Sequence, residues 1–324
     1  MEISLNDILS ILSATIRLST PLIFAAMAGI FSERSGVVDI SLEGKLLAGA
    51  FVAASVAAVT GSAWLGLGSA MLVGIVLSLV HGFASITHKG DQVVSGVAIN
   101  IIVSGLTVVL GMAWFQRSGQ TPTLPNSARF MPIELPGVEL LSNIPIIGSI
   151  YSKLISGHNL LVYLAFACVA FTYWVLFKTR FGLRLRAVGE NPKAVDTAGI
   201  SVAFLRYRAI IIGGILTGIG GTYISIAQNA SFIKDMSAGQ GFIALAAMIF
   251  GKWKPIPAMF SCFLFGFLQA LSMRLQGVSL PIIGEVPVQL IQAAPYILTV
   301  VLLAGFVGRA IAPKAVGVPY VKER

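Results

Sequence analysis

The sequence has few charged residues for its length. Asp, Glu, Lys and Arg make up only 11% of its 324 residues, whereas 56% are hydrophobic and the mean hydropathy is +0.89. Soluble globular chains are about 25% charged and about 45–50% apolar. The composition therefore excludes an ordinary soluble domain and predicts an all-α polytopic membrane protein.

Residues that usually carry catalysis or bind metals are also scarce. The three histidines are neither paired nor set at the spacing of metal ligands, and the two cysteines lie inside apolar segments. No H-E-x-x-H or G-x-S-x-G motif occurs. Gly44-Lys45 does not complete a phosphate-binding loop, because Asp39 stands where such a loop needs its first glycine. We expect no metal, no cofactor and no catalytic site, so ATP hydrolysis would need a separate ATP-binding subunit.

Apolar segments of about 20 residues, the length that crosses a bilayer, recur along the chain. They lie at roughly 8–31, 40–60, 64–86, 92–115, 159–177, 207–228, 239–251, 256–276 and 289–308. The segment 239–251 is short and begins at two closely spaced glycines, which is typical of a half-helix or broken span. We expect about 8–10 transmembrane helices and a short re-entrant or surface helix within 141–155.

Basic residues outnumber acidic ones by 22 to 13. In a soluble domain this excess would suggest nucleic acid, but here the basic residues cluster in loops between apolar segments, as the positive-inside rule describes. The loop 178–208 holds seven basic residues and is predicted to be cytoplasmic, whereas the nearly balanced connection 116–158 is predicted to be external. We therefore expect an external N-terminus, a cytoplasmic C-terminus, contacts with membrane lipid and no nucleic-acid partner.

A short pattern occurs twice. Asp39-Ile-Ser41 and Asp235-Met-Ser237 each precede a pair of alanines at the same spacing. Because five predicted spans separate the copies, they would have opposite orientations in the membrane. Inverted repeats with broken helices are common in transporters, so we predict such a repeat. Chance similarity among many alanines is the alternative.

Candidate residues for a solute pathway are neutral and polar. In the segment 92–115 a stripe of small and polar residues recurs every three or four positions, and it includes Asn100 and Ser104. Gln228, Asn229 and the nearby aromatic Phe24 are further candidates. Such a lining suits an uncharged, hydrogen-bonding solute such as a nucleoside or simple sugar. The alternatives are close helix packing for the stripe and ordinary packing for the aromatic residue.

Ionisable residues inside the spans are few. We expect Glu43 and Lys45, near the start of a span, to reach the interface by snorkelling. No predicted span carries a central acidic residue, so coupling to a proton or sodium gradient is not expected.

The loop 178–208 contains a compact helix signal. Asn191 suits the N-cap, Pro192 suits the first helical position and Gly199 can end the helix in a left-handed conformation. A short capped helix between basic anchors predicts a docking element for a soluble partner.

Three stretches, 32–51, 186–200 and 220–255, resemble permease subunits of bacterial ABC importers. The resemblance is to the branch of ribose, simple-sugar and branched-chain amino-acid permeases, and most of all to its nucleoside-type members. It covers nearly the whole chain, which implies a single permease transmembrane domain over 1–324 in the bacterial inner (cytoplasmic) membrane.

The resemblance also implies partners. The family's coupling helix corresponds to 190–199, and its docking residues would be Glu190, Asn191, Pro192, Lys193, Ala194 and Gly199. The expected partners are an ATP-binding subunit, a second permease subunit (homologous or identical) and an extracytoplasmic solute-binding protein. A stand-alone secondary transporter or facilitator for a small polar solute is the alternative.

Overall fold

The computed structural model describes residues 5–138, 144, 146–275, 279–280, 284–285, 293, 297, 301 and 311–322. Within these residues seven helices are long and apolar enough to cross a membrane. They are α1 (Leu5–Arg34), α2 (Leu42–Thr60), α3 with its π-helical end η1 (Ala63–Gly82, Phe83–Thr87), α4 (Gln92–Phe115), α7 (Leu160–Lys178), α10 with η4 (Val202–Thr222, Tyr223–Gln228) and α12 (Pro255–Leu275).

The predicted spans match these helices closely, with two qualifications. The predicted half-helix is confirmed as α11 (Gln240–Phe250), which is shorter than the seven long helices. At about 1.5 Å per residue it reaches about half-way across a bilayer. The ninth predicted span, 289–308, falls almost entirely outside the described residues.

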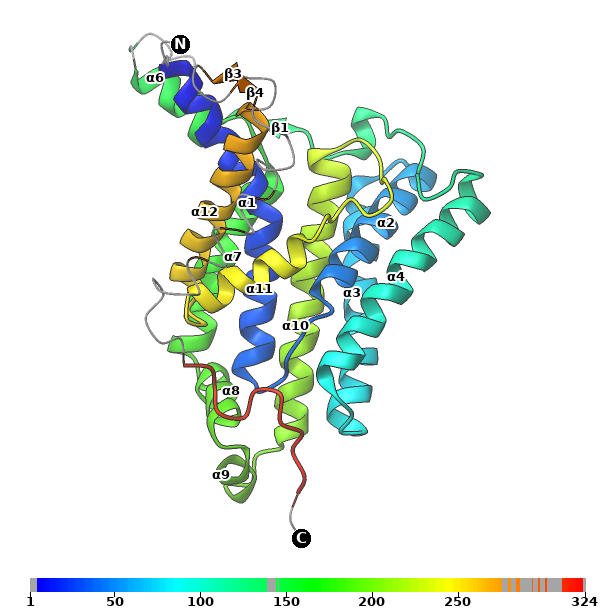
Figure 1. Ribbon diagram of the computed structural model, residues 1–324, viewed down its shortest axis with the longest axis vertical. Helices are drawn as coiled ribbons and strands as arrows, with labels where there is room; N and C mark the ends of the chain where they lie inside the picture. Colours follow the sequence, from blue (N-terminus) through cyan, green and yellow to red (C-terminus); the bar gives the residue numbers. More distant parts are fainter. Residues whose placement is uncertain are drawn as a thin grey trace.

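The helices form one bundle around α1 and α10 (Figure 1). α10 packs against α3, α2 and α1, while α1 also packs against α12, α11 and α7. The contact between α3 and α10 depends on glycine: a Cβ atom at Gly74 would lie 2.0 Å from the carbonyl oxygen of Gly214. Small residues of this kind let helix backbones approach closely in membranes, where van der Waals packing drives association.

Two opposite ends of the bundle carry the connecting segments (Figure 1). One, the α9 end, holds α8 (Arg180–Glu190) and α9 (Pro192–Thr197). The other, the N-terminal end, holds the start of α1, η2 (Asn126–Ala128), α6 (Ile147–Ile150) with η3 (Tyr151–Ile155), and the antiparallel pair β1 (Pro132–Ile133) and β2 (His158–Asn159). A second antiparallel pair joins β3 (Ser279–Leu280) to β4 (Gly284–Glu285). The short helix expected within 141–155 corresponds to α6 and η3.

Residues 311–322, which we term the C-terminal strap, run across the α9 end (Figure 1). Three hydrogen bonds hold it: Ala315 N–H to the Gly189 oxygen (2.8 Å), Gly317 N–H to the Gly36 oxygen (3.2 Å) and Arg206 Nη1–H to the Val318 oxygen (3.2 Å). The strap thus joins α8, the link between α1 and α2, and the start of α10.

Candidate functional site

The predicted docking helix forms as its capping residues indicate. The Asn191 side-chain oxygen accepts a hydrogen bond from Ala194 N–H at 3.1 Å, and Pro192 occupies the first helical position of α9. Gly199 follows with a φ of +77°, a left-handed conformation that glycine adopts without strain. These local contacts define where α9 begins and where the chain turns away from it.

The docking segment 190–199 spans two helices. Glu190 is the last residue of α8, and the helix predicted to begin at Pro192 is α9, with Asn191 between the two. The loop 178–208 is accordingly mostly helical. Val195 anchors α9 inward and is buried, whereas the predicted docking residues lie outside: Glu190, Asn191, Lys193, Ala194 and Gly199 are exposed and Pro192 is half-buried.

The second copy of the Asp-x-Ser pattern contacts the start of α2, just after the first copy. The Glu43 carboxylate, in the first turn of α2, accepts hydrogen bonds from Ser237 Oγ (2.6 Å), Gly239 N (2.8 Å) and Gly241 N (2.6 Å). The last two are free amides at the start of α11, where a carboxylate is favoured by both hydrogen bonding and the helix dipole. We call this contact the Glu43 clamp.

The link before α2 is held by buried charges. Lys45 Nζ and Asp39 Oδ2 are 2.6 Å apart, and both side chains are completely buried. The expectation that Lys45 snorkels to an interface is therefore wrong, because the lysine finds its counter-ion inside the bundle. Glu43 likewise points to α11 rather than to an interface.

Asn100 does not simply line a pathway. Its side-chain oxygen accepts a hydrogen bond from Gly44 N–H at 2.7 Å, and its Nδ2 donates to the Ile40 oxygen at 3.0 Å. It therefore holds both the link and the first turn of α2 against α4. Close helix packing accompanies these bonds, because a Cβ atom at Gly44 would lie 3.0 Å from the Asn100 Cα and one at Gly96 would lie 3.1 Å from Ser41 N.

The other predicted pathway residues lie in different surroundings. Ser104 is half-buried and donates to Asp235 Oδ1 at 2.8 Å. Gln228 and Asn229 are exposed at the end of η4, and Asn229 Nδ2 donates to the Ile224 oxygen at 2.8 Å. Phe24 is completely buried in the core and is not accessible to a solute in this conformation. The structure thus brings Gln228 and Asn229 together but not with Phe24.

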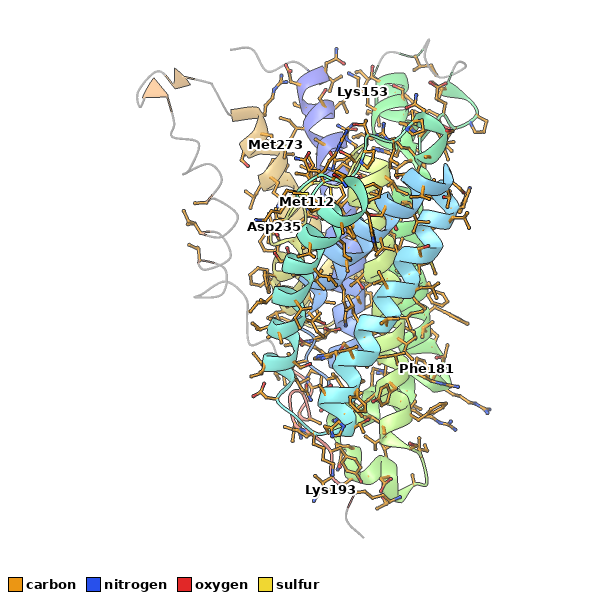
Figure 2. All side chains as sticks on the ribbon, turned by 90° about the vertical axis from the view of Figure 1, so that its right-hand side faces the viewer. Met112, Lys153, Phe181, Lys193, Asp235 and Met273 are labelled. Carbon is orange, nitrogen blue, oxygen red and sulfur yellow. The ribbon has the colours of Figure 1, made fainter. Side chains whose placement is uncertain are left out.

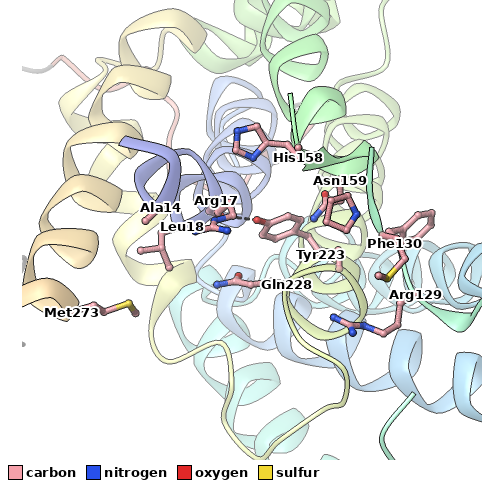
Figure 3. A pocket seen from close by; sticks show the side chains of 14 residues that line it. Ala14, Arg17, Leu18, Arg129, Phe130, His158, Asn159, Tyr223, Gln228 and Met273 are labelled. Atoms are coloured by element: carbon pink, nitrogen blue, oxygen red, sulfur yellow. Dashed lines mark hydrogen bonds between the residues drawn. The ribbon is translucent and has the colours of Figure 1, made fainter. Parts of the chain in front are cut away.

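A cavity of about 480 Å³ opens at the N-terminal end of the bundle (Figure 3). Its volume falls within the range of about 300–1,000 Å³ that holds small organic ligands. Polar side chains from four segments line it: Arg17, Arg129, His158, Asn159, Tyr223 and Gln228. The Tyr223 hydroxyl donates to the Arg17 carbonyl oxygen at 2.9 Å and so ties η4 to α1 across the cavity.

Two polar atoms of this cavity's residues are unsatisfied. Burial lowers the pKa of His158, so the ring is neutral at pH 7, and the 3.2 Å contact of Nε2 with the Leu154 oxygen assigns its proton to Nε2. His158 Nδ1 and Arg129 Nε are buried without a partner among the described residues. Both atoms are buried, so neither is open to the cavity in this conformation. Only Gln228 of this lining was predicted from the sequence.

The other residues that matter here had only weak signals in the sequence. Glu43 was visible only as a charge near a span start, and Asp235 only as part of the repeated pattern. Within the part of the chain that the structure describes, no group of His, Cys, Asp and Glu could hold a metal ion.

Comparison with known proteins gives consistent relationships. Residues 11–312 match the family described as branched-chain amino acid transport system / permease component. The chain is 42% identical to the guanosine ABC transporter permease protein NupQ of Bacillus subtilis, over 98% of this chain and 99% of that protein. It is also 42% identical to the nucleoside ABC transporter permease protein NupC of Lactococcus lactis, over 94% of this chain and 95% of that protein. A second B. subtilis protein, the guanosine ABC transporter permease protein NupP, is 24% identical over 86% of this chain and 76% of that protein.

Proposed function

Because this chain belongs to the family of branched-chain amino acid transport permease components, whose members are multi-pass proteins of the cytoplasmic membrane, we propose that it is the membrane-spanning subunit of an ATP-driven nucleoside importer. The observation that carries the substrate class is the similarity over almost the full length to two nucleoside-type permeases. The cavity at the N-terminal end supports it, because it is large enough for a nucleoside and is lined by hydrogen-bonding side chains that include Asn159, Tyr223 and Gln228.

The proposed complex contains more than this chain. A separate ATP-binding subunit supplies the energy, and an extracytoplasmic binding protein delivers the solute. The second permease is proposed to be a different homologue rather than a second copy. The basis is that B. subtilis has two different guanosine permease proteins, one 42% and the other 24% identical to this chain.

Within this complex, α9 is the proposed contact with the ATP-binding subunit, and the α9 end is therefore cytoplasmic. Its outer face presents Ala194, Thr197 and Ala198, which are small and exposed, so a groove of the partner can approach the helix backbone. α9 is joined to α8 on one side and to α10 on the other, which lets nucleotide-driven movement pass to the bundle as a rigid-body displacement.

Transport by the purified complex tests the proposal. Proteoliposomes that contain both permeases and the ATP-binding subunit, with binding protein outside and ATP inside, are expected to accumulate guanosine and to do so only with ATP. Ribose in the same assay tests a simple-sugar substrate. Uptake by this chain alone, driven by an ion gradient, would instead establish the secondary-transporter alternative.

The contact of α9 is tested by Ala194→Trp. The bulky ring on the exposed face should block docking, so less ATP-binding subunit should co-purify while membrane insertion stays normal. Ser127→Trp is the matched control, since Ser127 is also small and exposed but lies at the opposite end of the bundle. Equal co-purification with both variants would contradict the docking role.

A further inference from the structure

Asp235 contacts a membrane-spanning helix half-way along its length. Its carboxylate accepts a hydrogen bond from Ser104 at 2.8 Å, and Ser104 sits half-way along α4, which runs from Gln92 to Phe115. At about 1.5 Å per residue, Ser104 is about 16 Å from one end of α4 and about 18 Å from the other. Figure 2 shows Asp235 between Lys153 and Lys193, nearer to Lys153 and close to the height of Met112 in the last turn of α4.

At this depth Asp235 is exposed. A carboxylate that faces hydrocarbon is costly, and ionisable residues at membrane depth usually face a water-filled cavity or another protein. The backbone around it is not helical over residues 229–239. Residues 120–124 cover its first part, through hydrogen bonds from Thr121 N–H to the Phe232 oxygen and from Leu124 N–H to the Ala230 oxygen, whereas Asp235 and Ala238 beyond it are exposed. Non-helical backbone at membrane depth occurs only where protein covers it or water reaches it. The face of the bundle that carries Asp235 therefore does not contact lipid.

The backbone of this segment is held in an uncommon conformation. Asp235 and Ala238 have φ values of +53° and +46°, in the left-handed region that L-residues seldom adopt. Between them, Ser237 is fixed by the Glu43 clamp. Strained backbone that the surrounding structure maintains is concentrated at binding sites and switch regions. Here the left-handed backbone directs the Asp235 carboxylate toward Ser104, and Asp235 remains exposed.

We propose that Asp235, oriented by Ser104, binds the solute during its passage, on a face that the second permease covers to form a water-filled path. An ionised carboxylate only accepts hydrogen bonds and has two oxygens to do so. It therefore fits a neutral solute with two adjacent donors, which a nucleoside supplies either as the vicinal hydroxyls of ribose or as the neighbouring N–H groups of guanine. This inference rests on the proposed importer function.

The proposal is tested with Asp235→Asn in the reconstituted complex. The amide keeps the size of the side chain but replaces one acceptor by a donor, so guanosine uptake should fall by about tenfold or more, as expected for a hydrogen bond to a charged group. Asp91→Asn is the matched control, because Asp91 caps the start of α4 and asparagine caps a helix equally well. Wild-type guanosine uptake by the Asp235→Asn complex would overturn the proposal.

Substrate analogues distinguish the two sources of paired donors. If the carboxylate binds the ribose, the wild-type preference for guanosine over 2′,3′-dideoxyguanosine should shrink in Asp235→Asn. If the carboxylate binds the base, the preference for guanosine over inosine, which lacks the 2-amino group, should shrink instead. The binding protein's own selectivity is common to both complexes and cancels in the comparison. Unchanged preferences for both analogues would overturn the proposed contact.

Accessibility gives a readout that does not depend on transport. In the full complex, Asp235→Cys should react with a membrane-impermeant maleimide, whereas the natural Cys168 and Cys262 are buried. Ile102→Cys is the control, because Ile102 is exposed on the opposite side of α4 from Ser104 and should contact lipid. A failure of Asp235→Cys to react would overturn the water-filled path. Absence of ATP-dependent uptake by the wild-type complex would instead refute the importer function itself.

Discussion

Replacing Glu43 by glutamine removes the charge of the clamp while preserving its shape. In the protein one carboxylate oxygen accepts from Ser237 Oγ and Gly239 N, and the other accepts from Gly241 N at 2.6 Å. A glutamine can keep the first pair of contacts through its oxygen. Its NH₂ group then faces the Gly241 N–H, so that two donors oppose each other and the amide at the start of α11 loses its acceptor.

The expected loss follows from two contributions. A hydrogen bond to a charged group contributes about 1.5–3 kcal/mol, and a carboxylate at a helix N-terminus contributes about 0.3–1 kcal/mol more, or up to ~2 kcal/mol when partly buried. The free energy that holds the start of α11 closed should therefore fall by about 2–4 kcal/mol. At about 1.4 kcal/mol per tenfold, local opening should become about 30-fold to about 700-fold more frequent.

Hydrogen exchange of the purified protein measures this opening directly. The amides of Gly239 and Gly241 should exchange faster by that factor in Glu43→Gln, while amides in the centre of α10 should be unaffected. Glu134→Gln is the matched control, since Glu134 is exposed in the connection before α6. Unchanged exchange at the two glycine amides would refute the reasoning that Glu43 holds α11 in place.

Three further substitutions test the packing and the buried charges. Gly74→Ala should destabilise the protein by more than about 1–3 kcal/mol in thermal unfolding, because its Cβ would overlap the backbone of Gly214. Gly68→Ala in the same helix is the control, because its Cβ meets open space and should leave the unfolding temperature nearly unchanged. Lys45→Met should cost about 3–5 kcal/mol by leaving Asp39 buried without its counter-ion, and adding Asp39→Asn should recover part of the loss in the same thermal assay. Asn100→Leu removes partners from two backbone groups and should lower thermal stability by about 2 kcal/mol or more, whereas an unchanged midpoint would exclude this supporting role.

Features encoded by neighbouring residues were predictable from the sequence. The cap formed by Asn191 and Pro192, and the left-handed turn at Gly199, involve contacts within a few positions, so residue preferences suffice to locate α9. Hydropathy likewise located the long helices, and the shortness of the apolar run in 239–251 indicated the half-helix α11.

Features that join distant parts of the chain were not predictable in this way. The clamp pairs Glu43 with amides nearly 200 positions away, and the contact of Ser104 with Asp235 spans 131 positions. Residue type also misled where burial decides the role. Phe24 suits a solute pathway chemically, yet the packing of α1 encloses it completely. Only the arrangement of helices shows that an aspartate outside the predicted spans contacts the middle of one of them.

The C-terminal strap has a consequence for how the protein is made. Its hydrogen bond to Gly36 joins residues that are translated after residue 310 to a link that emerges near the beginning of synthesis, and its hydrogen bond to Gly189 joins them to α8. Helices can insert into the membrane one after another, but this end of the bundle cannot close until the strap has been translated. Until then the buried guanidinium of Arg206 lacks its contact with Val318. A ribosome that stalls before residue 315 would therefore leave inserted helices whose α9 end lacks the contacts of the strap.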